Sequence, residues 1–195
     1  MRQKNTRIVL VAKWLSLSVL ILAGFVVPFL SKVISLSYNY IFLFTIVTSF
    51  STIIVGLLVK PFVDQIGSKS MIIISSFGVA ALSIVWAMLP ATTPIFILFL
   101  LHFFNMFFLG MVLILIGRLF LISIPDNDRI TFASMVNFFS ALVALLTGLC
   151  GGYLIDMGEQ MHSNIINSYG LVFLAVMFLS CANGIVCCFL KEKGS

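Results

Sequence analysis

Three polar residues lie inside long apolar runs of this chain and are the first candidates for chemistry. His102 and Asn105 belong to the uncharged run Ser70–Gly117, and Asn137 belongs to the uncharged run Ile130–Ile155. At a spacing of three, His102 and Asn105 share one face of a helix. Polar groups at membrane depth usually face a bundle interior or a wet cavity. Two interpretations stay open for all three residues: solute or proton handling, or hydrogen bonds that only fix helix packing.

The sequence lacks the motifs of the common enzyme classes. It contains no His-Glu-x-x-His, no Gly-x-Ser-x-Gly, no phosphate-binding Gly-Lys-Ser/Thr and no pair of intramembrane aspartates. His102 is the only buried base that an intramembrane hydrolase could use. The cysteines lack metal-ligand spacing and are interpreted as small apolar residues: Cys150, Cys181, Cys187 and Cys188. We therefore expect no enzymatic activity, no metal site and no cofactor.

The composition determines which elements carry these residues. Of the 195 residues, 62% are hydrophobic and 9% are charged, against about 25% charged residues in a soluble domain. Five intervals contain no Lys, Arg, Asp or Glu: Trp14–Ser31, Val33–Val59, Ser70–Gly117, Ile130–Ile155 and Met161–Leu190. A transmembrane helix needs roughly 20 apolar residues, and the continuous apolar character excludes the alternating pattern of barrel strands. The sequence predicts an all-α, polytopic membrane protein whose partner is the lipid bilayer.

The Pro90–Pro94 segment divides the longest uncharged interval into two crossings. We predict a single membrane domain over 1–195 with six spans, at about 8–30, 39–59, 71–89, 95–117, 130–154 and 169–190. Ten basic residues then face one side of the membrane: Arg2, Lys4, Arg7, Lys13, Lys60, Lys69, Arg118, Arg129, Lys191 and Lys193. Only Lys32 faces the other side. The positive-inside rule places both termini in the cytoplasm, and no nucleic-acid partner is needed to explain the net charge of +5.

Aromatic residues at the expected outer ends of the spans agree with this topology: Tyr38, Tyr40, Trp86, Tyr153 and Tyr169. Such residues form belts at membrane interfaces. The fifth span also carries small residues at intervals of four: Ser140, Ala144, Gly148 and Gly152. Small residues at this spacing let two helix backbones approach closely. We expect tight helix packing along this stripe, with bending during a transport cycle as the alternative.

A polar turn, Lys60–Lys69, separates the second span from the third. Asp64, Gly67 and Lys69 in this turn resemble the loop signature of the major facilitator superfamily, although Lys60, Gln65 and Ser68 replace its first glycine and two basic residues. Arg118 at the inner end of the fourth span, and Pro125 to Arg129 leading into a fifth span that ends at Asp156, are similar to the same region of facilitator halves. The resemblance covers Ile8 to Leu190 as one six-helix half, most like the C-terminal half.

The resemblance implies two inverted three-helix repeats and a solute site between two halves. It makes His102, Asn105 and Asn137 candidates for a cavity, and it makes Asp64, with Arg118 as partner, part of a cytoplasmic latch. One half cannot enclose such a site. We therefore expect a half-size transporter of a small solute in the cell (inner) membrane that pairs with itself, as a homodimer, or with a complementary half. The alternative is a non-transporting membrane subunit or a truncated remnant of a longer transporter.

Overall fold

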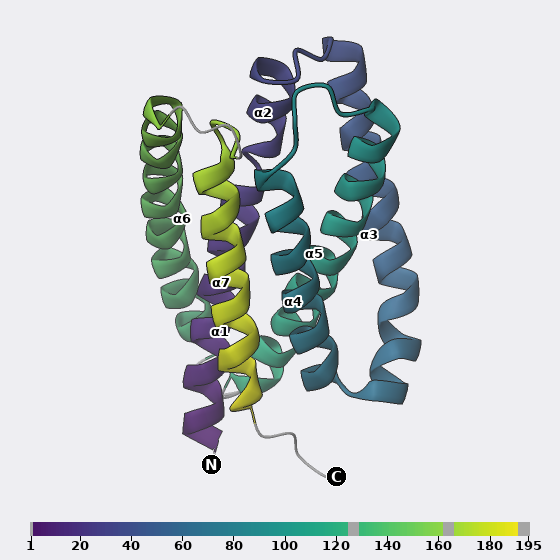
Figure 1. Ribbon diagram of the computed structural model, residues 1–195. Coiled ribbons are helices and arrows are strands. Elements are labelled where there is room, and N and C mark those ends of the chain that lie inside the picture. Colours follow the sequence, from purple (N-terminus) through teal and green to yellow (C-terminus); the bar gives the residue numbers. More distant parts are fainter. Residues whose placement is uncertain (1, 125–128, 162–165, 191–195) are drawn as a thin grey trace.

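The computed structural model describes residues 2–124, 129–161 and 166–190, which form helices and no strands. The helices are α1 (Arg2–Ala23), α2 (Val26–Lys32), α3 (Tyr38–Ile66), α4 (Ser68–Ala87), α5 (Ile95–Ser123), α6 (Arg129–Gln160) and α7 (Gly170–Cys188) (Figure 1). Within the described residues, six helical segments are long and apolar enough to cross a membrane, with α1 and α2 together forming the first. The chain is therefore an all-α, polytopic integral membrane protein.

The second span is longer than the sequence predicts, and the polar turn at its end is shorter. α3 continues through Pro61 to Ile66, so its 29 residues extend over roughly 43 Å at 1.5 Å per residue. Phe62 and Val63 pack against a buried apolar cluster, which favours the helical conformation even though Pro61 removes one backbone hydrogen bond. Only Gly67, with φ 87° and ψ 152°, separates α3 from α4. The sequence predicts a turn from Lys60 to Lys69, and the structure instead continues the helix to Ile66.

The first span is broken near Gly24, which the sequence analysis did not anticipate. α1 ends at Ala23, and α2 begins at Val26. Pro28 has no backbone N–H to donate to the carbonyl of Gly24, four residues earlier. The chain instead makes short-range bonds there, including Phe25 N to Leu22 O at 3.1 Å and Val27 N to Gly24 O at 3.3 Å. The break is a consequence of Pro28, which removes a helical hydrogen bond at this point.

Four helices form the centre of the bundle. α4 packs along α7, α5 packs against α1 and α4, and α1 also packs against α7. The remaining two long helices lie at opposite edges, where α3 packs mainly on α5 and α6 mainly on α1 (Figure 1). α3 and α6 are accordingly the least buried of the six candidate spans. α4 and α7 cover α1 and α5 on one side of the bundle only.

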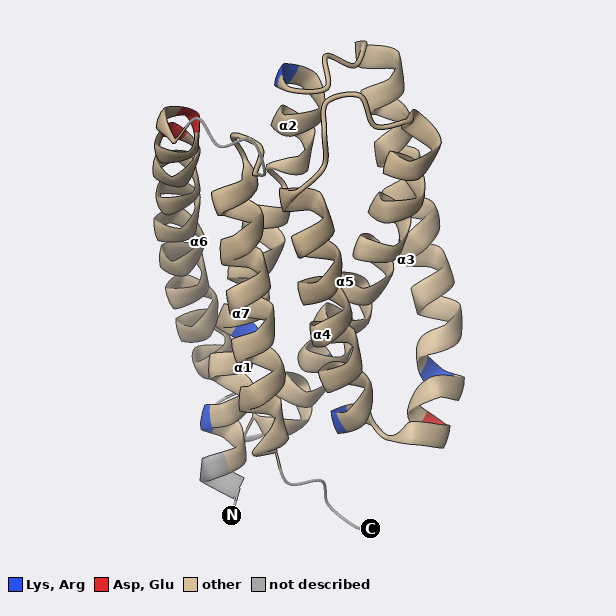
Figure 2. Ribbon diagram, viewed as in Figure 1, with Lys and Arg blue, Asp and Glu red and all other residues tan. Residues whose placement is uncertain are grey.

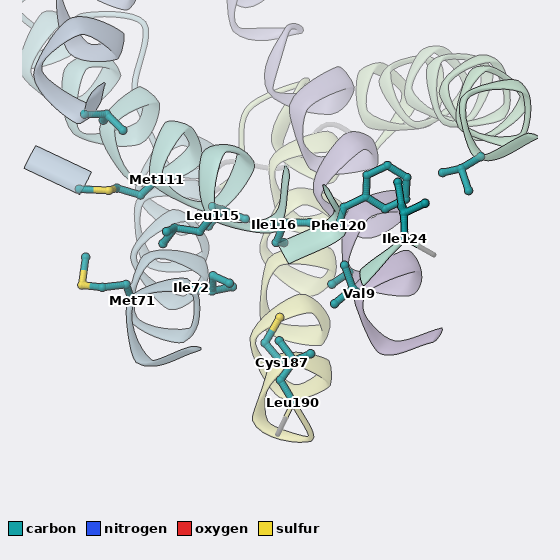
Figure 3. Close-up of a cluster of buried hydrophobic side chains, with 14 residues drawn as sticks. Val9, Met71, Ile72, Met111, Leu115, Ile116, Phe120, Ile124, Cys187 and Leu190 are labelled. Carbon is teal, nitrogen blue, oxygen red and sulfur yellow. The ribbon is translucent and has the colours of Figure 1, made fainter. Parts of the chain in front are cut away.

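Apolar clusters hold the two ends of the bundle together. At the end where α1 begins, side chains from α1, α4, α5 and α7 converge, including Val9, Ile72, Leu115 and Cys187 (Figure 3). At the opposite end, the ring of Phe29 contacts the rings of Trp86, Tyr169 and Phe173 at centroid distances of 6.0, 5.9 and 5.6 Å. Such edge-on contacts are the favourable geometry for aromatic pairs.

The aromatic cluster corrects part of the predicted interface belt. Trp86 and Tyr169 are each 1% exposed and lie inside the bundle, whereas Tyr38 and Tyr153 are 87% and 67% exposed. Tryptophan and tyrosine are typical of a membrane interface, but Trp86 and Tyr169 instead pack inside the bundle against Phe29, which lies next to the break in the first span.

Charged residues are distributed unequally between the two ends of the bundle (Figure 2). Lys and Arg residues lie in the lower parts of α1, α3 and α4, at the end where α1 begins and α7 ends, and one further cation lies at the opposite end in α2. The predicted cations Lys191 and Lys193 lie outside the described residues, as do the side chains of Arg2, Lys4 and Arg129. Among described residues, Lys and Arg are therefore more numerous at the end of the bundle where α1 begins.

Candidate functional site: a buried histidine and its surroundings

His102 lies on α5 at its interface with α3 and is 4% exposed. Its Nε2 atom is 2.8 Å from the hydroxyl oxygen of Thr48 on α3. The hydroxyl of Thr48 also donates to the carbonyl oxygen of Phe44 at 3.0 Å. Since a threonine hydroxyl has a single hydrogen, this network assigns the proton to Nε2, and His102 donates to Thr48.

The other imidazole nitrogen is an unused acceptor. Nδ1 of His102 is buried and has no hydrogen-bond partner in the described part of the chain. The ring of Phe44 packs edge-on against the imidazole, with centroids 5.2 Å apart. The neutral imidazole is therefore fixed by Thr48 and Phe44, and its free nitrogen can accept a hydrogen bond or a proton.

Asn105 shares a face of α5 with His102 but is not hydrogen-bonded to it. Asn105 is 3% exposed, and its Oδ1 atom is buried without a partner. His102 and Asn105, which the sequence suggested as a pair, are therefore two neighbouring buried polar residues, each with an acceptor atom that is not hydrogen-bonded. An unsatisfied buried acceptor costs about 1–3 kcal/mol, so each of these atoms is an energetically favourable place for a donor to bind.

Asn137 does not join this group within the chain. It lies exposed on α6, as does Ser134 one turn before it. α6 packs on α1 and α7, whereas His102 faces α3. The structure thus brings His102 and Asn105 together and leaves Asn137 on a different, open helix surface.

The stripe of small residues on α6 also needs correction. A Cβ atom added to Gly148 or Gly152 meets no atom within 4 Å, so neither glycine makes the expected close approach within this chain. Ser140 is buried and Ala144 is half-buried. The close approach is made instead by Gly151, where a Cβ would clash with the ring of Phe25 and lie 2.9 Å from Cδ2 of Leu22.

The residues of the loop signature lie at one end of the bundle. Asp64 is in the last turns of α3 and Arg118 is in α5, and both side chains are exposed. No ion pair joins them. Gly67 provides the one-residue corner between α3 and α4, and Lys69 lies at the beginning of α4.

A second buried polar cluster, which the sequence pattern did not indicate, surrounds Asn183. The side-chain amide of Asn183 on α7 donates to the hydroxyl oxygens of Ser16 on α1 and Ser76 on α4, each at 3.2 Å. Ser180, one turn before Asn183, is 2% exposed. The available signal was a set of serine and asparagine residues within uncharged runs, but only the fold brings them together.

No group of three or more His, Cys, Asp or Glu residues able to hold a metal ion occurs in the described ranges. Taken together, the fold and the buried polar groups define a polytopic helical membrane protein with polar contacts between its spans. No known protein family, curated protein or solved structure matches this chain.

Proposed function

We propose that this chain is one half of a transporter similar to the major facilitator superfamily, and that it moves a small solute after pairing with a second copy or a complementary half. The observation that carries this proposal is the pattern of helix neighbours. The remaining support comes from the exposed surfaces of α3 and α6 and from the resemblance in the Lys60–Lys69 segment.

The neighbour relations are unchanged when the first three spans are exchanged with the last three. α3 packs on α5 as α6 packs on α1, and α4 packs on α5 as α7 packs on α1. The exchange swaps α1 with α5 and α4 with α7, so the α1–α5 contact and the α4–α7 contact are each converted into themselves. Because each group contains an odd number of spans, the exchange reverses direction across the membrane. This is the relation expected for inverted repeats.

Two hydrogen bonds join equivalent pairs of helices in this scheme. Thr48 on α3 bonds to His102 on α5 at 2.8 Å. Thr147 on α6 bonds to Ser18 on α1 at 3.0 Å. Each outer helix is thus joined to the corresponding central helix by a threonine hydroxyl. The support for a repeat relation is limited to the helix pairs, because Thr48 and Thr147 lie at different distances from the first residues of their helices.

α3 and α6 each present a stripe of small and polar residues next to the face that packs on the bundle. On α3, the residues that face α5 include Phe44, Thr48, Ser51 and Val55. The stripe lies one position later, about 100° around the helix, and its exposed members are Thr45, Ser49, Thr52 and Gly56. On α6, the residues that face α1 include Ser140, Ala144, Thr147 and Gly151. The surface one position later consists of Ala141, Leu145, Gly148 and Gly152, so it is made of small residues except at Leu145.

The equal displacement matters for assembly. An in-plane two-fold relation between α3 and α6 would bring one stripe onto the other and place both on the same side of the bundle. Small residues permit close helix contact in lipid, and the opposite flank of α3 carries the large side chains Ile46 and Phe50. We assign the second half to the small-residue side, where Asn137 is also exposed.

The resemblance and the charge distribution support a cytoplasmic position for the end that carries Asp64, Gly67, Lys69 and Arg118, with the chain in the cell (inner) membrane. There Asp64 and Arg118 contribute to a latch that forms in only part of the transport cycle. An exposed pair of this kind contributes about 0–1 kcal/mol, enough to shift a balanced equilibrium. Asp64 and Arg118 are exposed and make no ion pair with each other in the described part of the chain, which favours the second candidate, a non-transporting subunit or remnant.

Cross-linking and uptake together test the proposal. In a chain with its four native cysteines replaced, Thr52→Cys combined with Gly148→Cys should give an oxidised dimer in membranes. The control variant combines Phe50→Cys with Leu146→Cys, which puts the two cysteines on the opposite flanks of α3 and α6. This variant should give no oxidised dimer. If neither pair cross-links and the detergent-solubilised particle is strictly monomeric, pairing of this chain with itself is wrong.

Uptake should be screened in cells that express the chain alone and together with any neighbouring six-span half, with sugars, amino acids and toxic small molecules as probes. A growth or uptake phenotype that disappears in His102→Leu, at unchanged membrane expression, is the expected result. The absence of any phenotype in both settings would favour the non-transporting subunit.

A further inference from the structure

A small internal cavity lies where α1, α4, α5 and α7 meet. Its volume is about 10 Å³, which is room for about one water molecule. The polar part of its wall consists of Ser16, Ser76, Ser180 and Asn183, and the rest is Val and Leu. α1 and α4 belong to the first three spans, and α5 and α7 belong to the last three, so the cavity lies where the two groups of spans meet.

The hydrogen bonds around the cavity are well defined on one side. Ser16 donates its hydroxyl hydrogen to the carbonyl oxygen of Ala12 at 2.8 Å, so towards Asn183 it can only accept. This fixes the orientation of the Asn183 amide: its NH₂ group donates to Ser16 and to Ser76. The Oδ1 atom of Asn183 has only a long contact, 4.0 Å, from the thiol of Cys187. Asn183 Oδ1 therefore retains acceptor capacity.

The hydroxyl of Ser180 is the unusual group in the cavity wall. It is buried and has no hydrogen-bond partner within the described chain. Serine and threonine hydroxyls inside helices commonly donate to the carbonyl four residues earlier. Ser83 does so to Val79 at 2.8 Å, and Ser123 does so to Leu119 at 2.7 Å. Ser180 does not make this bond, although it is as deeply buried as Ser83 at 2% exposure.

We propose that the cavity is a binding site for one internal water molecule, which accepts or donates a hydrogen bond at Ser180 Oγ and is held by the oxygens of Ser76 and Asn183. A buried water typically makes about three hydrogen bonds to groups that are otherwise unsatisfied. These three side chains supply that number. The water links α7 to α4, and through Asn183 and Ser16 also to α1. The site belongs to the core of the bundle and is separate from the His102 region on α5.

The first test uses the full chain in detergent and compares Ser180→Ala with Ser83→Ala. Both substitutions remove a buried serine hydroxyl of equal exposure, but only Ser180 lines the cavity. If the water is bound, Ser180→Ala removes one of its partners and lowers the midpoint of thermal unfolding by roughly 2–4 °C or more, beyond the change in Ser83→Ala. If the cavity is dry, Ser180→Ala removes an unsatisfied group. A midpoint at or above wild type therefore overturns the proposal.

A second test is independent of how the variants fold. An experimental structure of the wild-type chain that resolves ordered water should show a density peak within hydrogen-bond distance of Ser180 Oγ. A well-resolved cavity without this peak overturns the proposal even if Ser180→Ala is destabilised. The same unfolding measurement in sodium chloride and in choline chloride at equal ionic strength should give equal midpoints. A higher midpoint in sodium chloride would assign the site to a cation instead of water.

Discussion

The imidazole of His102 donates a hydrogen bond to the hydroxyl of Thr48 across 2.8 Å, which joins the fourth span to the second. The bond leaves Nδ1 of the same ring buried and without a partner in the described part of the chain. It therefore both stabilises the α3–α5 interface and fixes which nitrogen of the ring is available to another group.

Replacing Thr48 with valine tests the structural role of this bond. Thr48→Val keeps the volume but leaves Nε2 of His102 without an acceptor, so we expect a loss of about 1–3 kcal/mol in the free energy of unfolding. Thermal or denaturant unfolding in detergent measures it. Thr52→Val is the matched control, because Thr52 is exposed and bonds only to the carbonyl of Thr48 in its own helix at 2.9 Å. Equal losses in both variants would contradict the assigned role.

Gly67 forms the corner between α3 and α4 with φ 87° and ψ 152°, a region that is essentially restricted to glycine. We expect Gly67→Ala to destabilise the chain by about 1–3 kcal/mol through backbone strain. Gly117→Ala is the control, since a Cβ there meets no atom within 4 Å. The readout is the midpoint of unfolding. A Gly67→Ala chain as stable as the Gly117→Ala chain would show that the corner has a different conformation.

Gly151 and Gly148 have opposite expected responses to a larger side chain. Gly151→Leu must displace Phe25 and Leu22, so we expect loss of helix packing and a lower unfolding midpoint. Gly148→Leu adds a side chain in open space and should leave the unfolding midpoint near wild type while weakening assembly through the α6 stripe. Light scattering of the purified particle measures the assembly. A monomer destabilised by Gly148→Leu would contradict the position of this residue on α6.

The orientation of the bundle can be read from two exposed lysines, Lys32 in α2 and Lys60 in α3. In a chain with its native cysteines replaced, a membrane-impermeant maleimide should label Lys32→Cys in intact cells. It should label Lys60→Cys only after the membrane is opened. Replacement of the native cysteines is needed because Cys150 and Cys188 are exposed. The reverse labelling pattern would invert the topology and remove the cytoplasmic latch from the proposed function.

Several features of the fold follow from sequence patterns that act locally. The uncharged runs predict six spans because each must satisfy its backbone within lipid, and the Pro90–Pro94 segment divides the longest run because proline disfavours a continuous helix. The break at Gly24 is also local in origin, but its signal, Pro28, lies inside an apolar run and resembles a proline that a membrane helix tolerates. The end of α3 was mispredicted because packing of Phe62 and Val63 outweighed the turn propensity of the polar residues around them.

By itself, the sequence determined the membrane class, the approximate spans, the unequal distribution of charge and the burial of His102 and Asn105. These depend on hydrophobicity and helical periodicity, which can be read from neighbouring residues. Only the tertiary structure decided that Thr48 is the partner of His102, that Gly151 rather than Gly148 makes the close contact, and that Asn183 gathers Ser16 and Ser76. Each of these depends on how a helix is rotated and displaced against another helix. In an almost uniformly apolar chain, that rotation is set by side-chain packing between segments that can be more than 100 residues apart.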